Sequence, residues 1–528
     1  MLRRGRIPWI SLHLTFFFLT LLAQPVSSQT PPPNPELDKL GTQAWNLYRN
    51  GDIDGAIAIY QRAVSQNPND GSLYFNLGLM LAEKGHLPEA AAAYEKSVTL
   101  LDKPGTAKPN LSNALNNLAL VYYRQTRLDD ADARIDRALQ LLPANSGAWV
   151  SRGLVLEARG KTDEAIVAYR KALSLTPRSA TANQNLGVAL QNKGRIAEAI
   201  SVLDTGVKSH PHDSDLLAAY GSALLAGDRL PEADAAFRAS LAESPDASNV
   251  LFNLGVTLRR EAKLTEALEV LQKAYVVAPG DSAIASSLGT LLVQLGRAEE
   301  AIPLLQGVLQ SQKAEPLTSY AMASALERQG RPSEALPFVQ SALAARPDYP
   351  EATALLGSLQ LETDHLAEAR KTVENGISGH PDSPDLHNCL GLVLLAENKP
   401  PEADAEFKQA LALRPNYEDA QVDHAIVLKR QQQASEAVDE FKKVLQVNPK
   451  NLKAQANLGV TLIDLHRYSE AAEAFSAAAQ LSPLDPDIRT NLAIALQKSG
   501  HELEAQKAIA EAKRLRAASG KKAGTTNP

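Results

Sequence analysis

The chain has 528 residues, of which 54 are Lys or Arg and 60 are Asp or Glu, so its formal net charge is −6. An acidic balance argues against a general nucleic-acid-binding protein, which would carry an excess of basic residues. The only cysteine is Cys389, which excludes an intramolecular disulfide and leaves packing to stabilise the fold. Aromatic residues make up only 5% of the chain, a composition that suits closely packed helices.

Residues 1–28 have the three parts of a secretory signal peptide. Three arginines precede an apolar run over residues 10–23, and short side chains at 26–28 follow where a signal peptidase cuts. The run is too short for a comfortable membrane span of about 20 residues. We expect cleavage after Ser28, which removes three Arg and no acidic residue and takes the net charge to −9. The alternative is an uncleaved membrane anchor. Residues 29–36 are proline-rich and predict an extended leader.

The rest of the chain repeats itself. Gly187, Gly221, Gly255 and Gly289 lie at a constant interval of about 34 residues, a period typical of a solenoid. The pattern divides the chain into fourteen units, which cover 37–70, 71–104, 112–145 and then equal steps from 146 to 519. We expect a helix A over positions 2–14 of each unit and a helix B over positions 18–31.

Three positions of the unit indicate how the two helices pack. Position 20 is Ala in all fourteen units, and position 8 is always Gly or Ala. Two antiparallel helices approach closely only where both lack bulk, so these positions predict their crossing point. Position 32 is Pro in eleven units, where the missing N–H ends helix B.

A few segments depart from this pattern. Residues 105–111 predict an inserted loop between the second and third units, and 520–528 predict a disordered tail. The eighth unit has Lys313 where Pro is expected. We therefore divide the array into 37–104, 112–315 and 316–519, and expect a change of superhelical pitch near 311–318 rather than a domain boundary. Pro303 and Pro337 fall near the first turns of their helices, where we expect the helices to continue.

This repeating pattern resembles the tetratricopeptide repeat. The resemblance covers 37–519 and implies an all-α, right-handed superhelical solenoid of about fourteen helix-turn-helix repeats. It also implies that helix A lines a concave groove, in which positions 2, 5, 6, 9, 12 and 13 face a bound peptide or helix.

Position 6 is Asn in six units, and an amide both donates to and accepts from a peptide backbone. The series is similar to the asparagine ladder of the superhelix in protein O-linked N-acetylglucosamine transferases. The alternative is that Asn at this position belongs to the repeat consensus and serves packing. The series is interrupted between 287 and 423, which puts one continuous groove in doubt. Its members are Asn76, Asn117, Asn185, Asn253, Asn457 and Asn491.

Positions 12 and 13 add positive charge at Arg259, Arg260, Lys429 and Arg430. Asn253 with the two arginines is similar to the clamp by which some tetratricopeptide domains hold a C-terminal carboxylate, but the matching Lys positions are absent. The alternative is that these residues are exposed charges at helix ends.

No motif for catalysis or for a cofactor is present. The sequence has no Gly-rich phosphate loop, no His-Glu-x-x-His and no Gly-x-Ser-x-Gly. His210 and His212 flank a proline but offer at most a weak metal site, and His86 and His466 fall in turns between helices. We therefore expect no enzyme activity, no cofactor and no metal.

Together these features predict an exported scaffold for protein interactions, periplasmic or secreted, that binds a protein or peptide and neither nucleic acid nor, once the signal is cleaved, a membrane. Two alternatives stay open. One is a substrate-recruiting arm for a separate glycosyltransferase, suggested by the asparagines. The other is an anchored component of envelope assembly, if the signal is retained.

Overall fold

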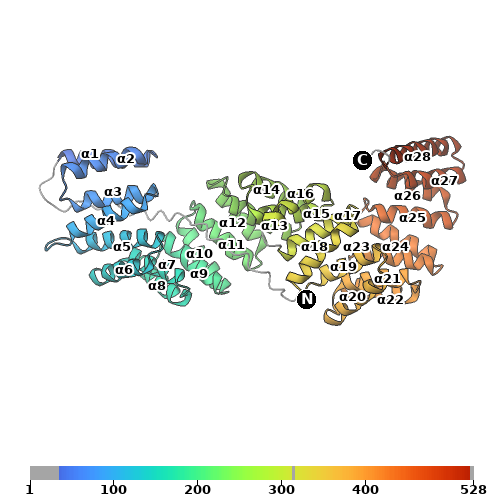
Figure 1. Ribbon diagram of the computed structural model, residues 1–528, viewed down its shortest axis with the longest axis horizontal. Helices are drawn as coiled ribbons and strands as arrows, with labels where there is room; N and C mark the ends of the chain where they lie inside the picture. The colour runs from blue at the N-terminus through green and yellow to red at the C-terminus, as the bar shows by residue number, and fades with distance from the viewer. Residues whose placement is uncertain (1–34, 312–314, 524–528) are drawn as a thin grey trace. The chain divides into compact units, whose positions relative to one another are not determined.

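The computed structural model describes residues 35–311 and 315–523, and within them the chain is entirely helical (Figure 1). The 28 helices form the fourteen hairpins expected from the sequence, each an odd-numbered helix A packed against the following even-numbered helix B. The predicted signal peptide and most of the predicted leader lie outside the described residues.

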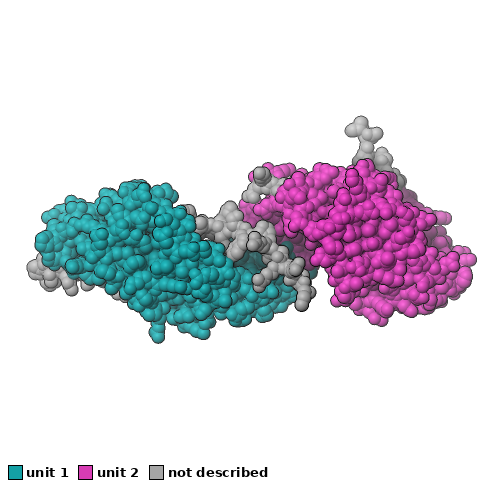
Figure 2. Space-filling view, turned by 90° about the horizontal axis from the view of Figure 1, so that it is seen from below, with its two compact units in different colours: residues 1–279 teal, residues 280–528 magenta. Residues whose placement is uncertain are grey.

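The chain divides into two compact units, residues 1–279 and 280–528, which Figure 2 colours separately. The helices of the first unit are α1 (Pro35–Arg49), α2 (Ile53–Gln66), α3 (Gly71–Glu83), α4 (Leu87–Leu101), α5 (Lys108–Arg124), α6 (Leu128–Leu141), α7 (Ser146–Ala158), α8 (Thr162–Leu175), α9 (Ala180–Asn192), α10 (Ile196–Ser209), α11 (Ser214–Ala226), α12 (Leu230–Glu243), α13 (Ser248–Arg260) and α14 (Leu264–Val277).

The helices of the second unit are α15 (Ser282–Gln294), α16 (Ala298–Ser311), α17 (Pro316–Arg328), α18 (Pro332–Ala345), α19 (Pro350–Glu362), α20 (Leu366–Gly379), α21 (Pro384–Ala396), α22 (Pro400–Leu413), α23 (Glu418–Arg430), α24 (Ala434–Val447), α25 (Leu452–Asp464), α26 (Tyr468–Leu481), α27 (Pro486–Lys498) and α28 (Glu502–Ala523).

The division between the units falls one repeat before the region where the sequence predicts a change of pitch. It lies between α14 and α15. At the predicted position, α16 and α17 pack against each other on either side of 312–314, which lie outside the described residues. Helices α16 and α18 continue through Pro303 and Pro337, as expected. The change of pitch itself stays a prediction.

The small residue at position 8 makes room for the side chain at position 24 of the same hairpin. A Cβ atom added to Gly255 would lie 2.5 Å from Leu271 Cγ, and one added to Gly459 would lie 2.7 Å from Phe475 Cε2. Both large side chains are fully buried. Small residues therefore lie at the crossing of the two helices, as predicted, and these two glycines face a large, buried side chain of helix B.

The turn between helices A and B uses a left-handed residue at position 15 of every repeat. Seven of these residues are glycine and seven are not. Ala262 has φ 60° and His466 has φ 57°, a conformation that costs an L-residue about 1–2 kcal/mol. The tight turn before helix B therefore imposes this backbone conformation whether or not the residue is glycine.

The odd-numbered helices lie on the inner side of each unit. Successive odd-numbered helices contact one another, as α9 does α11 and α19 does α21, whereas the even-numbered helices of the described residues make no comparable contacts among themselves. Each unit is therefore curved with helix A inside and helix B outside, as the resemblance implied.

Three predicted boundaries need correction. The inserted loop 105–111 is a loop only as far as Ala107, because α5 begins at Lys108 with a proline in its first turn, where the missing N–H is tolerated. The leader ends two residues early because α1 begins at Pro35 for the same reason. The predicted disordered tail is helical up to Ala523, because α28 continues two turns beyond the usual length of helix B.

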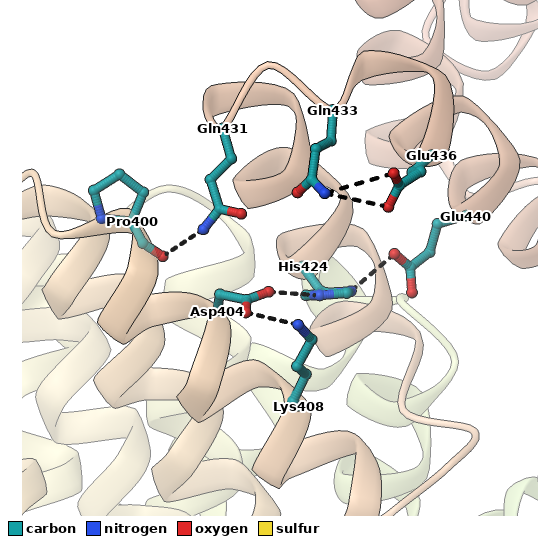
Figure 3. A network of polar contacts seen from close by, with 8 residues as sticks. All are labelled: Pro400, Asp404, Lys408, His424, Gln431, Gln433, Glu436 and Glu440. Atoms are coloured by element: carbon teal, nitrogen blue, oxygen red, sulfur yellow. Dashed lines mark hydrogen bonds and ion pairs between the residues drawn. The ribbon is translucent and has the colours of Figure 1, made fainter.

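A buried histidine joins repeats 11 and 12 in the second unit. The ring nitrogens of His424 on α23 lie 2.9 Å from Asp404 Oδ1 on α22 and 2.8 Å from Glu440 Oε2 on α24 (Figure 3). Lys408 Nζ donates to the other oxygen of Asp404 at 2.7 Å. Burial lowers the pKa of His424, but the hydrogen bonds and charges of the two carboxylates outweigh it and raise the pKa above its usual 6.5.

The crossing at position 8 predicts the effect of added bulk. Gly255→Leu must displace Leu271, so we expect it to destabilise the first unit by about 1–3 kcal/mol or more. Gly307→Leu is the matched control, because a Cβ there meets nothing within 4 Å and the change adds helix propensity. Urea unfolding followed by circular dichroism measures both, and equal stability of the two variants would contradict the assignment.

The His424 contacts predict a pH-dependent stability. Since folding raises the pKa, protonated His424 stabilises the native state fully below about pH 6.5, and this contribution is lost as pH rises through the folded-state value. Hydrogen exchange in α22–α24, corrected for intrinsic rates, should show a lower opening free energy at pH 8 than at pH 6. His424→Gln should remove the difference and His86→Gln, in an exposed turn, should keep it. A difference that survives His424→Gln would assign it to other groups.

Candidate protein-binding surface

The resemblance implies that positions 2, 5, 6, 9, 12 and 13 of helix A face the inner side of the array. We call positions 2, 5, 6, 9, 12 and 13 of the odd-numbered helices the first inner surface in residues 35–279 and the second inner surface in 280–523. The predicted site residues divide between them. Asn76, Asn117, Asn185, Asn253, Arg259 and Arg260 lie on the first surface. Lys429, Arg430, Asn457 and Asn491 lie on the second.

One of the asparagines on the first surface takes part in packing. Asn117 is only 7% exposed. Its Nδ2 donates to Tyr94 Oη at 3.4 Å, and its Oδ1 accepts from Asn116 Nδ2 at 3.4 Å. Tyr94 is itself fully buried against Gly78 in the preceding hairpin. At this position the amide links two repeats, which is the packing role that the sequence left open.

The other three asparagines of the first surface keep their amides available. Asn76, Asn185 and Asn253 are half-buried, and their side chains form no hydrogen bond with any residue in 35–311 or 315–523. The Nδ2 of Asn185 is buried without an acceptor. A buried donor without a partner is costly, so a carbonyl brought by a ligand would be stabilised there.

The two asparagines of the second surface differ from each other. Asn457 Nδ2 donates to the backbone carbonyl of Lys453, one turn earlier, at 2.8 Å. The side chain of Asn491 has no partner among the described residues. The amides that are free to bind therefore lie mainly in the first unit.

Three of the four predicted basic residues form hydrogen bonds or ion pairs with other residues of the chain. Two of these three are arginines. Arg260 donates to the Leu225 carbonyl at 3.2 Å and pairs with Asp228 at 2.8 Å. Arg430 donates to the Leu395 carbonyl at 3.2 Å. Each arginine thus satisfies a carbonyl at the end of the preceding helix A, which stabilises that helix C-terminus.

Lys429 is likewise paired, and one arginine is not. Lys429 Nζ lies 2.9 Å from Asp464 Oδ2 on the next repeat. Arg259 on α13 is half-buried, and its guanidinium forms neither a hydrogen bond nor an ion pair with the residues that the structure describes. Burial lowers the pKa of its guanidinium. Of the predicted clamp, Asn253 and Arg259 are left to meet a ligand.

The second inner surface carries carboxylates that the sequence analysis did not single out. Glu327 on α17, Glu362 on α19 and Asp419 on α23 occupy positions 12, 13 and 2. Burial and the charge of Glu362 raise the pKa of Glu327 to about 7, and Asp419 also contributes. The only signal in the sequence was that acidic residues occupy these positions between 287 and 423, where position 6 is not Asn.

No metal centre emerges. Within the described residues, no group of three or more His, Cys, Asp or Glu side chains is placed to hold a metal ion. His212 instead contacts Glu243 at 2.7 Å, and it is exposed. His86 and His466 are exposed in their turns, as the sequence predicted.

None of the helices in the described residues is long and apolar enough to cross a membrane. The predicted signal peptide lies outside the described residues.

Comparison with solved structures finds several helical-repeat chains at low sequence identity. The chain is similar to the APC/C hetero-tetramer Cut9–Hcn1 at 15% identity over 91% of this chain and 94% of that one, with a TM-score of 0.44. It is similar to the human IFIT1 dimer with PPP-AAAA at 17% identity over 74% of this chain and 94% of that one, with a TM-score of 0.41. Pseudomonas aeruginosa PilF matches at 21% identity over 41% of this chain and 97% of that one, with a TM-score of 0.38.

Comparison with protein families is more specific. No curated protein matches the sequence. Models described as tetratricopeptide repeat match residues 42–103, 185–248 and 422–486, residues 326–392 and residues 247–355, and a model described as TPR repeat matches 153–194. These matches fall on the hairpins whose helix A lies inside and whose helix B lies outside. The chain belongs to the tetratricopeptide repeat family.

Proposed function

We propose that this protein is a non-catalytic scaffold, exported from the cytoplasm, that holds a peptide or helix of a partner protein against its inner surfaces. Membership of a repeat family that typically binds proteins supports the interaction role. The observation that carries it is the set of half-buried inner amides without partners among the described residues: Asn76, Asn185 and Asn253.

The chemistry of these amides suits an extended main chain. They recur at the same position of helix A, in repeats 2, 5 and 7. Each amide offers one donor group and one acceptor, so it binds a peptide backbone whatever its side chains are. The apolar side chains between them, such as Val188 and Val256, are partly exposed and offer contact to a ligand. Main-chain hydrogen bonds with apolar contacts are a recurring mode of peptide recognition.

Export rests on the N-terminal sequence. Arginines, a short apolar run and the short residues before Gln29 together form the signal pattern. In a cell with a Gram-negative-type envelope, the protein would then act in the periplasm. A role in recruiting substrates to a separately encoded glycosyltransferase is a second candidate, favoured only by the free asparagines.

The binding role predicts the result of a pulldown from host envelope extract with the chain from residue 29. A variant with Asn76→Ala, Asn185→Ala and Asn253→Ala should fold normally and lose the partner, with affinity reduced about tenfold or more. Asn117 is left intact because its amide packs between repeats.

The control for this pulldown changes three exposed asparagines outside the inner surfaces, Asn69, Asn375 and Asn416, to Ala. It should recover the partner as the unchanged chain does. Equal recovery by all three proteins would refute binding through the inner amides. A glycosyltransferase among the proteins lost with the inner variant would favour the second candidate.

Export predicts the start of the mature protein. N-terminal sequencing of the chain purified from its host should begin at Gln29. A chain that retains residues 1–28 would contradict cleavage and favour the membrane-anchored alternative.

A further inference from the structure

We propose that the second inner surface binds a segment of the partner rich in arginine or lysine, a specificity that rests on the proposed function of the inner surfaces. The residues that carry it are four carboxylates, which we call the acidic patch. They are Glu327 on α17, Glu351 and Glu362 on α19, and Asp419 on α23.

The carboxylates of the acidic patch have no salt-bridge partner in the described part of the chain. None of the four carboxylates forms an ion pair or a hydrogen bond with residues in 35–311 or 315–523. Neighbouring carboxylates are matched, since Asp385 accepts two hydrogen bonds from Arg414 at 3.0 and 2.9 Å and Asp423 pairs with Lys453 at 2.6 Å. The absence of partners is therefore a property of the patch and not of the whole surface.

Bases at the inner positions of repeats 9–12 do not neutralise it. Lys429 is paired with Asp464, and Arg430 bonds the Leu395 carbonyl. Arg328 is exposed and without a partner among the described residues, and its charge lowers the pKa of Glu327 less than burial and Glu362 raise it. Arg414, which is bonded to Asp385, also interacts with Glu351. The charges of Arg328 and Arg414 are outnumbered by those of the four carboxylates and Asp385, which leaves a net negative surface.

The carboxylates converge although they come from different repeats. Glu327 feels the charges of Glu362 and Asp419, and Tyr320 feels those of Asp385, Glu351 and Glu327. Groups from repeats 9, 10 and 12 therefore share one region of the inner side. Like charges held close together are unfavourable until a cation joins them.

A second observation indicates that this region lacks a hydrogen-bond donor. Asn388, at position 5 of α21, is only 6% exposed, and its Oδ1 is buried with no donor among the described residues. Its side chain also hydrogen-bonds Asp423, whose pKa Asp419 also raises, so Asn388 lies beside a carboxylate that interacts with the patch. An ammonium or guanidinium group supplies both the positive charge and the N–H donors that these acceptors lack.

The negative charge of the acidic patch disfavours negatively charged ligands. A phosphate backbone or an acidic peptide would be repelled by the patch, because a further negative charge beside several carboxylates costs free energy. The first inner surface, with free amides and the unpaired Arg259, lacks this selectivity for cations.

A binding assay with matched charge changes tests the inference. The probe is a short fluorescent peptide with Arg at every third position, beside the same peptide with Gln in place of Arg. The inner variant combines Glu327→Gln, Glu362→Gln and Asp419→Asn. The outer variant combines Glu299→Gln, Glu368→Gln and Glu402→Gln, three exposed residues of helix B without partners among the described residues, and it changes the net charge equally.

Fluorescence anisotropy should give dissociation constants of the Arg peptide for the unchanged chain and for the outer variant that agree within about twofold. The inner variant should bind the Arg peptide about tenfold or more weakly than the unchanged chain. The Gln peptide should bind none of them. Equal binding by both variants would assign the attraction to overall charge and overturn the inference, as would equal binding of the Gln peptide. Circular dichroism confirms that both variants are folded.

The pH dependence provides a second readout. Glu327 faces Glu362, Arg328 and Asp419, and its pKa of about 7 means that it becomes ionised between pH 6 and pH 8. Arginine stays charged over this range. Affinity for the Arg peptide should therefore rise with pH, and Glu327→Gln should flatten the rise. An unchanged profile in Glu327→Gln would remove that residue from the site.

Failure here is distinguishable from failure of the proposed function. If the pulldown recovers a partner that depends on Asn76, Asn185 and Asn253 but the Arg peptide does not bind, the scaffold stands and the basic segment is refuted. If the Arg peptide binds through the patch, the inference stands whatever the pulldown from one extract returns.

Discussion

The close approach of two helices at position 8 of each repeat is the contact on which the rest of the structure depends. Only Gly or Ala leaves room there for the large side chain at position 24, and that side chain is buried in almost every hairpin. The contact fixes the angle between helices A and B, and thus the face that the next repeat meets. Stability then adds up from hairpins and the interfaces between neighbours, as in other solenoids.

Stacking of similar hairpins places helix A of successive repeats side by side on the inner side of each unit. Residues far apart in the sequence become neighbours there, and the two units use the inner positions differently. The first inner surface offers free amides and the unpaired Arg259. The second offers carboxylates without salt-bridge partners among the described residues and an unsatisfied amide oxygen at Asn388.

The repeat, the helix positions and the small residues at the crossing could be predicted from the sequence, because a constant period constrains every unit at once. The ends of the array were less predictable: α5 and α28 extend into segments expected to be irregular, since a helix end is decided by local capping. The non-glycine residues of the left-handed turn, such as Ala262, gave no signal because the turn imposes their conformation.

The candidate site was predictable in part. The period located the asparagines on one face, but contacts between repeats decide which amides are free, and these separate Asn117 from Asn185. The same applies to Arg260 and Arg430, which bond to carbonyls of the preceding repeat. The acidic patch was missed because its members occupy three different repeat positions and meet only when the array curves.

The most direct test of the account is to map where a partner touches the chain. Photo-crosslinking residues placed at Val256 and Leu392, on the inner sides of α13 and α21, are compared with the same groups at Val167 and Glu402, on the outer helices α8 and α22. Binding through helix A predicts crosslinks to a partner from the inner positions and none from the outer ones. Crosslinks confined to Val167 or Glu402 would place the interaction on the convex side and contradict the account.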